Sequence, residues 1–186
     1  MELMEVIRQR KSVRKYMDRP IERKSIEECV EAARLAPSAD NMQPWRFVVI
    51  DDPEMKKEYV NHVCRGMYRK TQFIQNAPAL VVVIAKLNLV VHRMGKLVTR
   101  TNIHLIDIGI AGEQLVLRAQ EMGIGTCWIN FFHVKRAGRF LGLPPTHRVV
   151  SMIAMGYPAE ESTKDRPKLP REKILFFNRS YEKGLR

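Results

Sequence analysis

The sequence contains little cysteine and no long apolar run. Its three cysteines, Cys29, Cys64 and Cys127, are odd in number and widely spaced, and none belongs to a C-x-x-C pair. That pattern argues against a disulfide framework or a zinc site and favours a reducing compartment. The longest clean apolar run, ALVVVIA at 79–85, is far shorter than the ~20 residues that span a bilayer. The N-terminus also lacks a basic region followed by an apolar stretch, so we expect no signal peptide and a soluble, cytoplasmic protein.

Familiar catalytic and metal-binding motifs are absent as well. The sequence has no H-E-x-x-H, P-loop, G-x-S-x-G or EF-hand spacing, and its five histidines are scattered singly. Gly123-x-Gly125 follows an expected helix and precedes an expected strand, the reverse of the order in a Rossmann turn, so we interpret it as a helix end. If the chain is an enzyme, its chemistry is therefore expected to come from a bound cofactor.

Positive charge is what the sequence has in excess. Lys and Arg total 32 against 20 Asp and Glu, which gives a formal net charge of +12. The segment RQRKSVRKY at 8–16 concentrates five of these cations beside an apolar helix start. Such a field favours an anionic ligand or partner: a nucleic-acid backbone, an acidic membrane surface or a small phosphate. The aromatic residues are not interleaved with the cations and no groove-reading motif is present, so we expect no nucleic-acid partner.

Hydrophobic periodicity predicts one α+β domain over 1–186, with an extended tail from about residue 159. Helices are expected at 2–9, 22–35, 53–59 with a weaker continuation to about 75, 102–122 and 133–142. Strands are expected at 45–50, 79–85, 126–130 and 148–158, in one central sheet of four to five strands covered by helices. The 102–122 helix is apolar around most of its circumference, which is typical either of a subunit-interface helix or of a central core helix.

Three separated segments offer groups for one binding site. The first is Arg10–Arg14, with guanidinium, ammonium and hydroxyl groups suited to a phosphate. The second is the polar loop APSADNMQPWRF at 36–47, and the third is the basic stretch DRPKLPREK at 165–173. Taken alone, the first and third segments are more simply explained as a solvated helix end and a solvated tail, and the second is equally well explained as an ordinary polar turn with Trp45 in the core.

The order and the amino-acid sequences of these segments resemble those of the FMN-dependent nitroreductase family over almost the whole chain. The resemblance rests on RQRKSVRKY, EAARLAPSADNMQPWRFVVI, NAPALVVVIA, GIGTCWI and RPKLP, in that order. It implies a three-layer sandwich with a central mixed or antiparallel sheet, assembled as an intertwined homodimer. It also implies tightly bound FMN at the subunit interface, with NAD(P)H as a transient electron donor.

The resemblance carries over to particular residues. Those expected to bind FMN are Arg10, Lys11, Ser12, Arg14, Pro37, Ser38, Ala39, Asn41, Gly125, Thr126, Cys127, Trp128, Arg166 and Lys168. Within this set, Pro37–Asn41 would come from the partner subunit, and Arg166 and Lys168 would close over the phosphate. No side chain is expected to act as a catalytic nucleophile, because the chemistry takes place at flavin N5. Arg14 is the candidate to stabilise the negative charge of reduced flavin, since an Arg stays protonated in the working range.

The implied activity is a ping-pong reaction in which NAD(P)H reduces the flavin and a small acceptor, such as a nitroaromatic or quinone, then reoxidises it. The segments 64–75 and 86–104 are expected to shape the acceptor pocket. Three alternatives remain open: a flavin-dependent reductive dehalogenase on the same scaffold, a flavin store or sensor, and a basic nucleic-acid-binding protein.

Overall fold

The computed structural model describes residues 2–87, 101–160 and 167–178. A single antiparallel sheet contains four strands in the order β1-β2-β4-β3. The strands are β1 (Trp45–Ile50), β2 (Ala79–Lys86), β3 (Gly125–Ile129) and β4 (His147–Gly156). The α-helices are α1 (Leu3–Gln9), α2 (Arg23–Arg34), α3 (Pro53–Val63), α5 (Ile103–Glu121) and α6 (Val134–Phe140). Three 3₁₀ helices, η1 (Ala39–Asn41), η2 (Gly66–Asn76) and η3 (Arg171–Lys173), complete the described elements.

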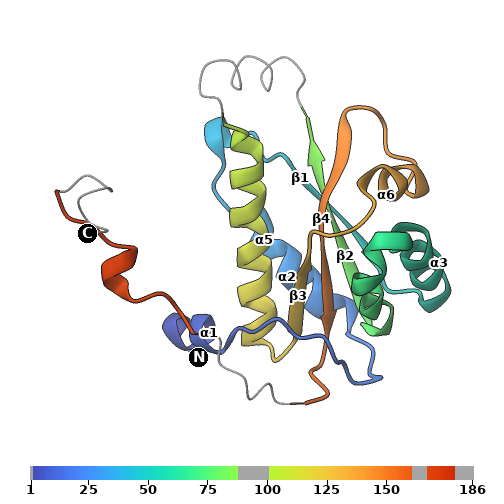
Figure 1. Cartoon of the computed structure of the whole chain (residues 1–186), viewed down its shortest axis with the longest axis horizontal. Coiled ribbons are helices and arrows are strands. Elements are labelled where there is room, and N and C mark those ends of the chain that lie inside the picture. The colour runs from blue at the N-terminus through green and yellow to red at the C-terminus, as the bar shows by residue number, and fades with distance from the viewer. Residues whose placement is uncertain (1, 88–100, 161–166, 179–186) are drawn as a thin grey trace.

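Helices cover both faces of the sheet and give the predicted three layers (Figure 1). Along β2, Val81 and Val83 face a core that includes residues of α2 and α5, whereas Leu80 and Val82 face a second core with residues of α3 and α6. Every β2 residue except Lys86 is buried. A strand covered on both faces needs no polar positions, which explains the uninterrupted apolar run in the sequence.

The expected element order is confirmed, and one helix boundary was wrong. α3 continues to Val63 instead of ending near Tyr59, and a separate 3₁₀ helix, η2, replaces the weak continuation. The start of α3 follows from its sequence: Asp52 accepts a hydrogen bond from the Met55 N–H and Pro53 occupies the first helical position. Gly66 then takes a positive φ of 61° where the chain turns into η2.

α5 has one buried face and one exposed apolar face. Leu115, Val116 and Ala119 pack in the core between α5 and the sheet. In contrast, the side chains of Leu105 and Ile106 are 44% and 54% exposed. The helix is apolar on both sides, but only one side is covered in the described chain, so α5 is not a central core helix buried all round.

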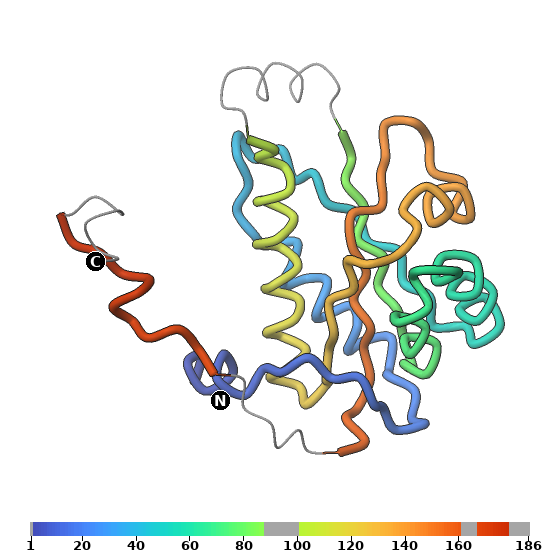
Figure 2. The backbone as a smooth tube through the Cα atoms, viewed as in Figure 1, coloured from blue at the N-terminus to red at the C-terminus, as the bar shows by residue number. Residues whose placement is uncertain are grey.

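Two further segments expose apolar side chains at the periphery. α1 exposes Leu3, Met4 and Ile7. Residues 167–178 lead away from the α/β body, as Figure 2 shows, and expose Leu169 and Phe177. None of the described helices is long and apolar enough to cross a membrane. All three cysteines are buried, and no disulfide bond joins them.

Candidate functional site

The basic segment after α1 lies against the start of β3. Ser12 forms a parallel bridge with Thr126, and the Val13 N–H donates to the Thr126 carbonyl at 2.9 Å. Farther along, the Met17 N–H donates to the Tyr157 carbonyl at 2.8 Å. The path of the segment across the lower ends of α5 and β3 is visible in Figure 2. Two of the sequence-predicted groups, Arg10–Arg14 and Gly125–Trp128, are thus brought together within one chain.

Tyr16 and Gly125 hold this segment in place. The Tyr16 hydroxyl donates to the Val13 carbonyl at 2.6 Å. Burial, with a smaller contribution from Cys127, raises the pKa of Tyr16 well above its ordinary value, so the hydroxyl remains a donor at any working pH. A Cβ added at Gly125 would lie 2.6 Å from the Val13 side chain. Only glycine therefore permits the segment to approach β3 this closely.

Arg10 and Arg14 keep donor capacity for an anion, whereas Lys15 is paired with Glu160 at 2.9 Å. Arg10 makes one loose ion pair, with its Nε 3.8 Å from a Glu113 carboxylate oxygen. Arg14 is exposed, and its Nη1 donates to the Ser12 carbonyl at 3.2 Å. The remaining guanidinium N–H groups have the forked geometry that matches phosphate oxygens. The donor set therefore fits the phosphate of a flavin mononucleotide.

β3 presents a large aromatic side chain next to this segment. Trp128 packs on α5 at Gly112, where an added Cβ would lie 2.2 Å from the indole ring. Cys127 is buried beside it. At the end of the strand, the buried Ser151 hydroxyl contacts Asn130 Oδ1 at 2.6 Å and fixes that exposed amide. The strand therefore combines a half-buried planar side chain with a fixed polar end.

The 37–43 loop holds a strained backbone conformation. Asp40, Asn41 and Gln43 all have positive φ, at 49°, 52° and 45°. Each such residue costs on the order of 1 kcal/mol, so the surrounding contacts must stabilise the conformation. The Gln43 N–H donates to Ser38 Oγ at 2.9 Å, and Gln43 Nε2 donates to Asn41 Oδ1 at 2.9 Å. Strain of this kind is concentrated at binding sites, where a particular backbone shape is needed.

This loop does not reach the basic segment within one chain. The Ala39 N–H points to the nearly buried Asp107 carboxylate at 3.4 Å, near the start of α5. Ser12 pairs with Thr126, which follows the opposite end of that helix. The Ser12–Thr126 bridge lies beyond the C-terminal end of α5 and the loop lies near its start, as Figure 1 shows; Arg10 approaches the middle of the helix at Glu113, where the helix has risen about 9 Å from Asp107. One protomer alone therefore does not assemble the complete predicted site.

The third predicted segment is only partly described. Lys168 is exposed at the start of the arm that leads away from the body, without a described contact to Arg10–Arg14. Arg166 lies outside the described residues, as does most of the 86–104 segment expected to shape the acceptor pocket. Within the described ranges, no three His, Cys, Asp or Glu side chains gather as metal ligands.

Comparison with known proteins agrees with this geometry. The model of the nitroreductase family matches residues 7–157, which include the basic segment, the strained loop and all four strands. The chain belongs to the nitroreductase family. A relative from Archaeoglobus fulgidus, named as an NADH dehydrogenase/NAD(P)H nitroreductase, is 35% identical over 86% of this chain and 87% of its own. A solved nitroreductase-family structure from Clostridium novyi superposes with a TM-score of 0.75 at 31% identity, covering 85% of this chain and 87% of that one.

Two more distant relatives are named for different reactions. The FMN reductase [NAD(P)H] of Bacillus subtilis is 25% identical, covering 93% of this chain and 72% of that protein. Iodotyrosine deiodinase 1 of Sus scrofa is 26% identical, covering 94% of this chain and 68% of that protein. The family match and the names of these relatives identify the chain as an NAD(P)H-dependent flavin oxidoreductase with the nitroreductase fold.

Three contributors to the site were not predicted from the sequence. Tyr16 and Asp107 appear as an ordinary aromatic and an ordinary acid, since their roles depend on contacts with distant backbone groups. Gly112 left a weak signal, because a glycine inside an apolar helix usually marks a close packing contact. The indole that it admits lies 16 residues farther along the chain and could not be specified in advance.

Replacing Gly112 with Ala should disturb Trp128 and destabilise the fold. The added methyl group overlaps the indole ring, and overpacking of this kind costs about 1–3 kcal/mol. We expect a lower melting temperature together with a changed near-ultraviolet circular dichroism signal. Gly138→Ala in α6 is the matched control, since the nearest atom to its Cβ is Leu143 Cδ1 at 3.9 Å. That control should be neutral or stabilising, and equal behaviour of the two variants would contradict the contact.

Proposed function

We propose that two copies of the chain form an intertwined homodimer that binds two FMN molecules and transfers electrons from NAD(P)H to small conjugated acceptors such as nitroaromatics and quinones. The observation that carries the proposal is the pairing of Ser12 with Thr126, since it joins the phosphate-binding cations to β3. Bound FMN would supply the two-electron chemistry, in a ping-pong sequence. The chain's own residues bind and orient it.

Each predicted group has a distinct task in this arrangement. Arg10, Lys11 and Ser12 provide cationic and hydroxyl donors for the phosphate and ribityl chain. Residues Gly125–Trp128 belong to β3, next to this segment, and their backbone groups and the Trp128 indole limit the position of a planar ring. Arg14 places a permanent positive charge where reduction leaves negative charge on the flavin. None of these roles requires a side-chain nucleophile.

A second copy of the chain supplies what one protomer lacks. The strained loop at 37–41 contacts the start of α5 at Asp107, whereas Arg10 reaches the middle of that helix and Ser12 pairs beyond its other end, so a partner would bring its own loop to the site. The apolar side chains exposed on α1, α5 and the 167–178 arm supply a surface for that partner. Lys168 and Arg166, on or beside the arm, would then contribute their charge to the phosphate.

Reductive dehalogenation is the second candidate function. The relative named iodotyrosine deiodinase 1 covers nearly all of this chain, which favours a shared scaffold. The two functions differ in the acceptor: a dehalogenase consumes halogenated phenols that have no nitro or quinone group. Turnover of such phenols, with little activity on nitroaromatics, would favour the second candidate.

The cofactor is the first feature to test. The purified protein should be yellow, and heat or acid should release FMN, not FAD, at about one molecule per chain. Chromatography of the released flavin against standards makes the measurement. Colourless protein that also fails to bind added FMN would contradict the proposal.

Mixing two defective chains tests whether each site is shared. Arg10→Glu alters the basic segment, and Ala39→Trp places a bulky group on the exposed loop; each homodimer should lose most of its FMN. In a hybrid dimer, one site combines both defects and the other combines two unaltered segments. We therefore expect the hybrid to recover about half of the wild-type FMN content, measured after purification through two different tags.

The control for this experiment is a hybrid of two chains that both carry Arg10→Glu, which should recover no FMN. If each site were built within one chain, every site of the mixed hybrid would contain one defect. Its FMN content would then stay as low as that of the homodimers, and the shared site would be excluded.

Arg14 tests the electrostatic role. Arg14→Ala should lower the flavin midpoint potential, because the negative charge that follows reduction loses a neighbouring cation. An interaction of about 1 kcal/mol for a solvated pair corresponds to roughly 20 mV for a two-electron couple. Spectroelectrochemical titration measures the shift, and Arg14→Lys, which keeps the charge, should recover most of it. An unchanged potential and unchanged FMN affinity in Arg14→Ala would remove Arg14 from this role.

A further inference from the structure

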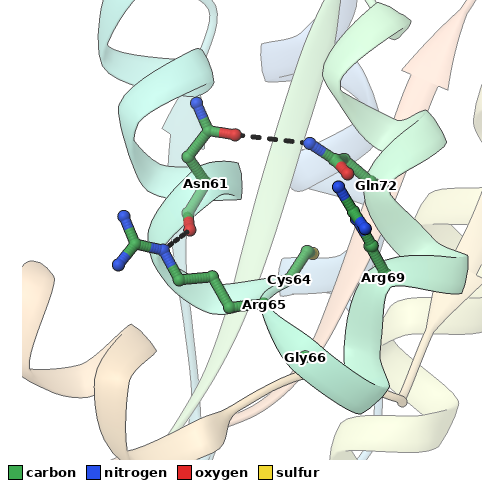
Figure 3. Close-up of a pocket in the computed structure, with 6 residues that line it drawn as sticks. All are labelled: Asn61, Cys64, Arg65, Gly66, Arg69 and Gln72. Atoms are coloured by element: carbon green, nitrogen blue, oxygen red, sulfur yellow. Dashed lines mark hydrogen bonds between the residues drawn. The ribbon is translucent and has the colours of Figure 1, made fainter.

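An open pocket lies between α3 and η2, mostly within the 64–75 segment expected to shape the acceptor pocket, and none of its lining residues is among those assigned to the flavin. Its volume is about 440 Å³, within the range of small-molecule sites. Figure 3 shows the residues that line it: Arg65 turns back along α3 toward the Asn61 carbonyl, and Arg69 extends toward Gln72 on the other side of Cys64. The lining residues are Asn61, Cys64, Arg65, Gly66, Arg69 and Gln72.

The lining is rich in hydrogen-bond donors and contains no carboxylate. Arg65 Nε donates to the Asn61 carbonyl at 2.7 Å, which orients the guanidinium and leaves its terminal amino groups available. Within the described part of the chain, the Arg69 guanidinium has no hydrogen bond or ion pair. Gln72 Nε2 donates to Asn61 Oδ1 at 3.4 Å, so the Asn61 amino group keeps both of its N–H donors. Two guanidinium groups without a competing acid favour an oxyanion.

The Cys64 side chain is uncharged and does not repel an anion. Its side chain is 3% exposed, and Thr71 Oγ1 contacts its Sγ at 3.4 Å. Burial raises the pKa of the Cys64 thiol above its ordinary value, so the sulfur is protonated and uncharged at neutral pH. The floor of the pocket is therefore a neutral thiol, and the positive charge of the two arginines is not offset by it.

The pocket is connected to the end of β3 through η2. Thr71 Oγ1, which contacts Cys64, also donates to the Phe131 carbonyl at 3.0 Å. The Tyr68 ring lies 4.8 Å from the Phe131 ring, measured between centroids. Phe131 follows the end of β3 by two residues, so these contacts link η2, which forms one side of the pocket, to the strand that carries Trp128.

We propose that the pocket between α3 and η2 binds the phosphate group of a phosphorylated small molecule through Arg65 and Arg69. A guanidinium fork matches phosphate oxygens in pairs, and the amides of Asn61 and Gln72 supply further donors. The volume leaves room for more than the phosphate itself. Two sources share this chemistry: the 2′-phosphate of NADPH and a separate phosphorylated metabolite. The first source rests on the proposed function, whereas phosphate binding itself does not.

Phosphate titration into the purified protein, as isolated, tests the site. Isothermal titration calorimetry at low ionic strength, where electrostatic binding is least screened, should detect inorganic phosphate. Arg65→Gln and Arg69→Gln should each weaken binding about tenfold, because each removes one charge-assisted contact. Both side chains are exposed, so the substitutions leave the core unchanged. Arg69→Lys keeps the charge without the fork and should lie between the wild type and Arg69→Gln.

Arg139→Gln is the matched control, since it removes the same charge from an exposed position on α6 outside the pocket. It should bind phosphate as the wild type does. Equal weakening by Arg139→Gln would show a general effect of surface charge and overturn the proposal. The proposal would also be overturned if Arg65→Gln and Arg69→Gln both bound phosphate as the wild type does. It would equally be overturned if the wild type showed no detectable binding at millimolar phosphate.

The Michaelis constants for NADPH and NADH distinguish the two sources. If the phosphate belongs to NADPH, the pocket variants should raise the NADPH constant about tenfold and leave the NADH constant unchanged. Lost phosphate binding with both constants unchanged assigns a separate phosphorylated molecule. The phosphate titration requires no turnover. Colourless protein that fails to bind FMN would contradict the proposed flavin function, and phosphate binding to the pocket could still be measured.

Discussion

The pairing of Ser12 with Thr126 is the contact on which the site depends. It fixes a highly charged segment, which would otherwise remain solvated, to the first residues of β3. Gly125 permits the approach by having no Cβ, and the Tyr16 hydroxyl holds the Val13 carbonyl from the other side. Cations placed by backbone contacts lose less conformational freedom on binding an anion than cations on a free tail, so the segment is prepared for a phosphate.

A second constraint is the length of α5. The helix keeps the strained 37–41 loop away from the basic segment of the same chain. It also leaves Leu105 and Ile106 exposed on the face turned away from the core. Both features have one explanation if a second copy packs on that face, because the partner then covers the apolar side chains and delivers its own loop to the site. Assembly and cofactor binding would therefore be linked, as the hybrid-dimer experiment tests.

Much of the fold could be predicted from periodicity and turn residues. The apolar run of β2 and the Asp52-Pro53 start of α3 specify their elements locally, and the resemblance supplied the family that the later comparisons confirmed. Other features depend on contacts between distant residues. The boundary between α3 and η2 follows from the backbone turn at Gly66, which gave no periodic signal. The pocket at Arg65 and Arg69 exists only because two helices of different type lie side by side, and a pattern of residues does not show that.

The distribution of ion pairs explains how a chain with a charge of +12 favours small anions. Carboxylates on α2, on α5 and after β1 already neutralise nearby arginines, as in the pairs Arg118–Glu28 and Arg23–Asp51. At the basic segment, the described carboxylate nearest to Arg10 is 3.8 Å away, and the α3–η2 pocket has no carboxylate in its lining. Arg10 and Arg14 in the basic segment, and Arg65 and Arg69 in the pocket, therefore keep charge for an anion, whereas Lys15 is paired with Glu160. We therefore expect these arginines to bind the phosphate groups of small molecules, which two guanidinium groups can hold without a continuous stripe of cations.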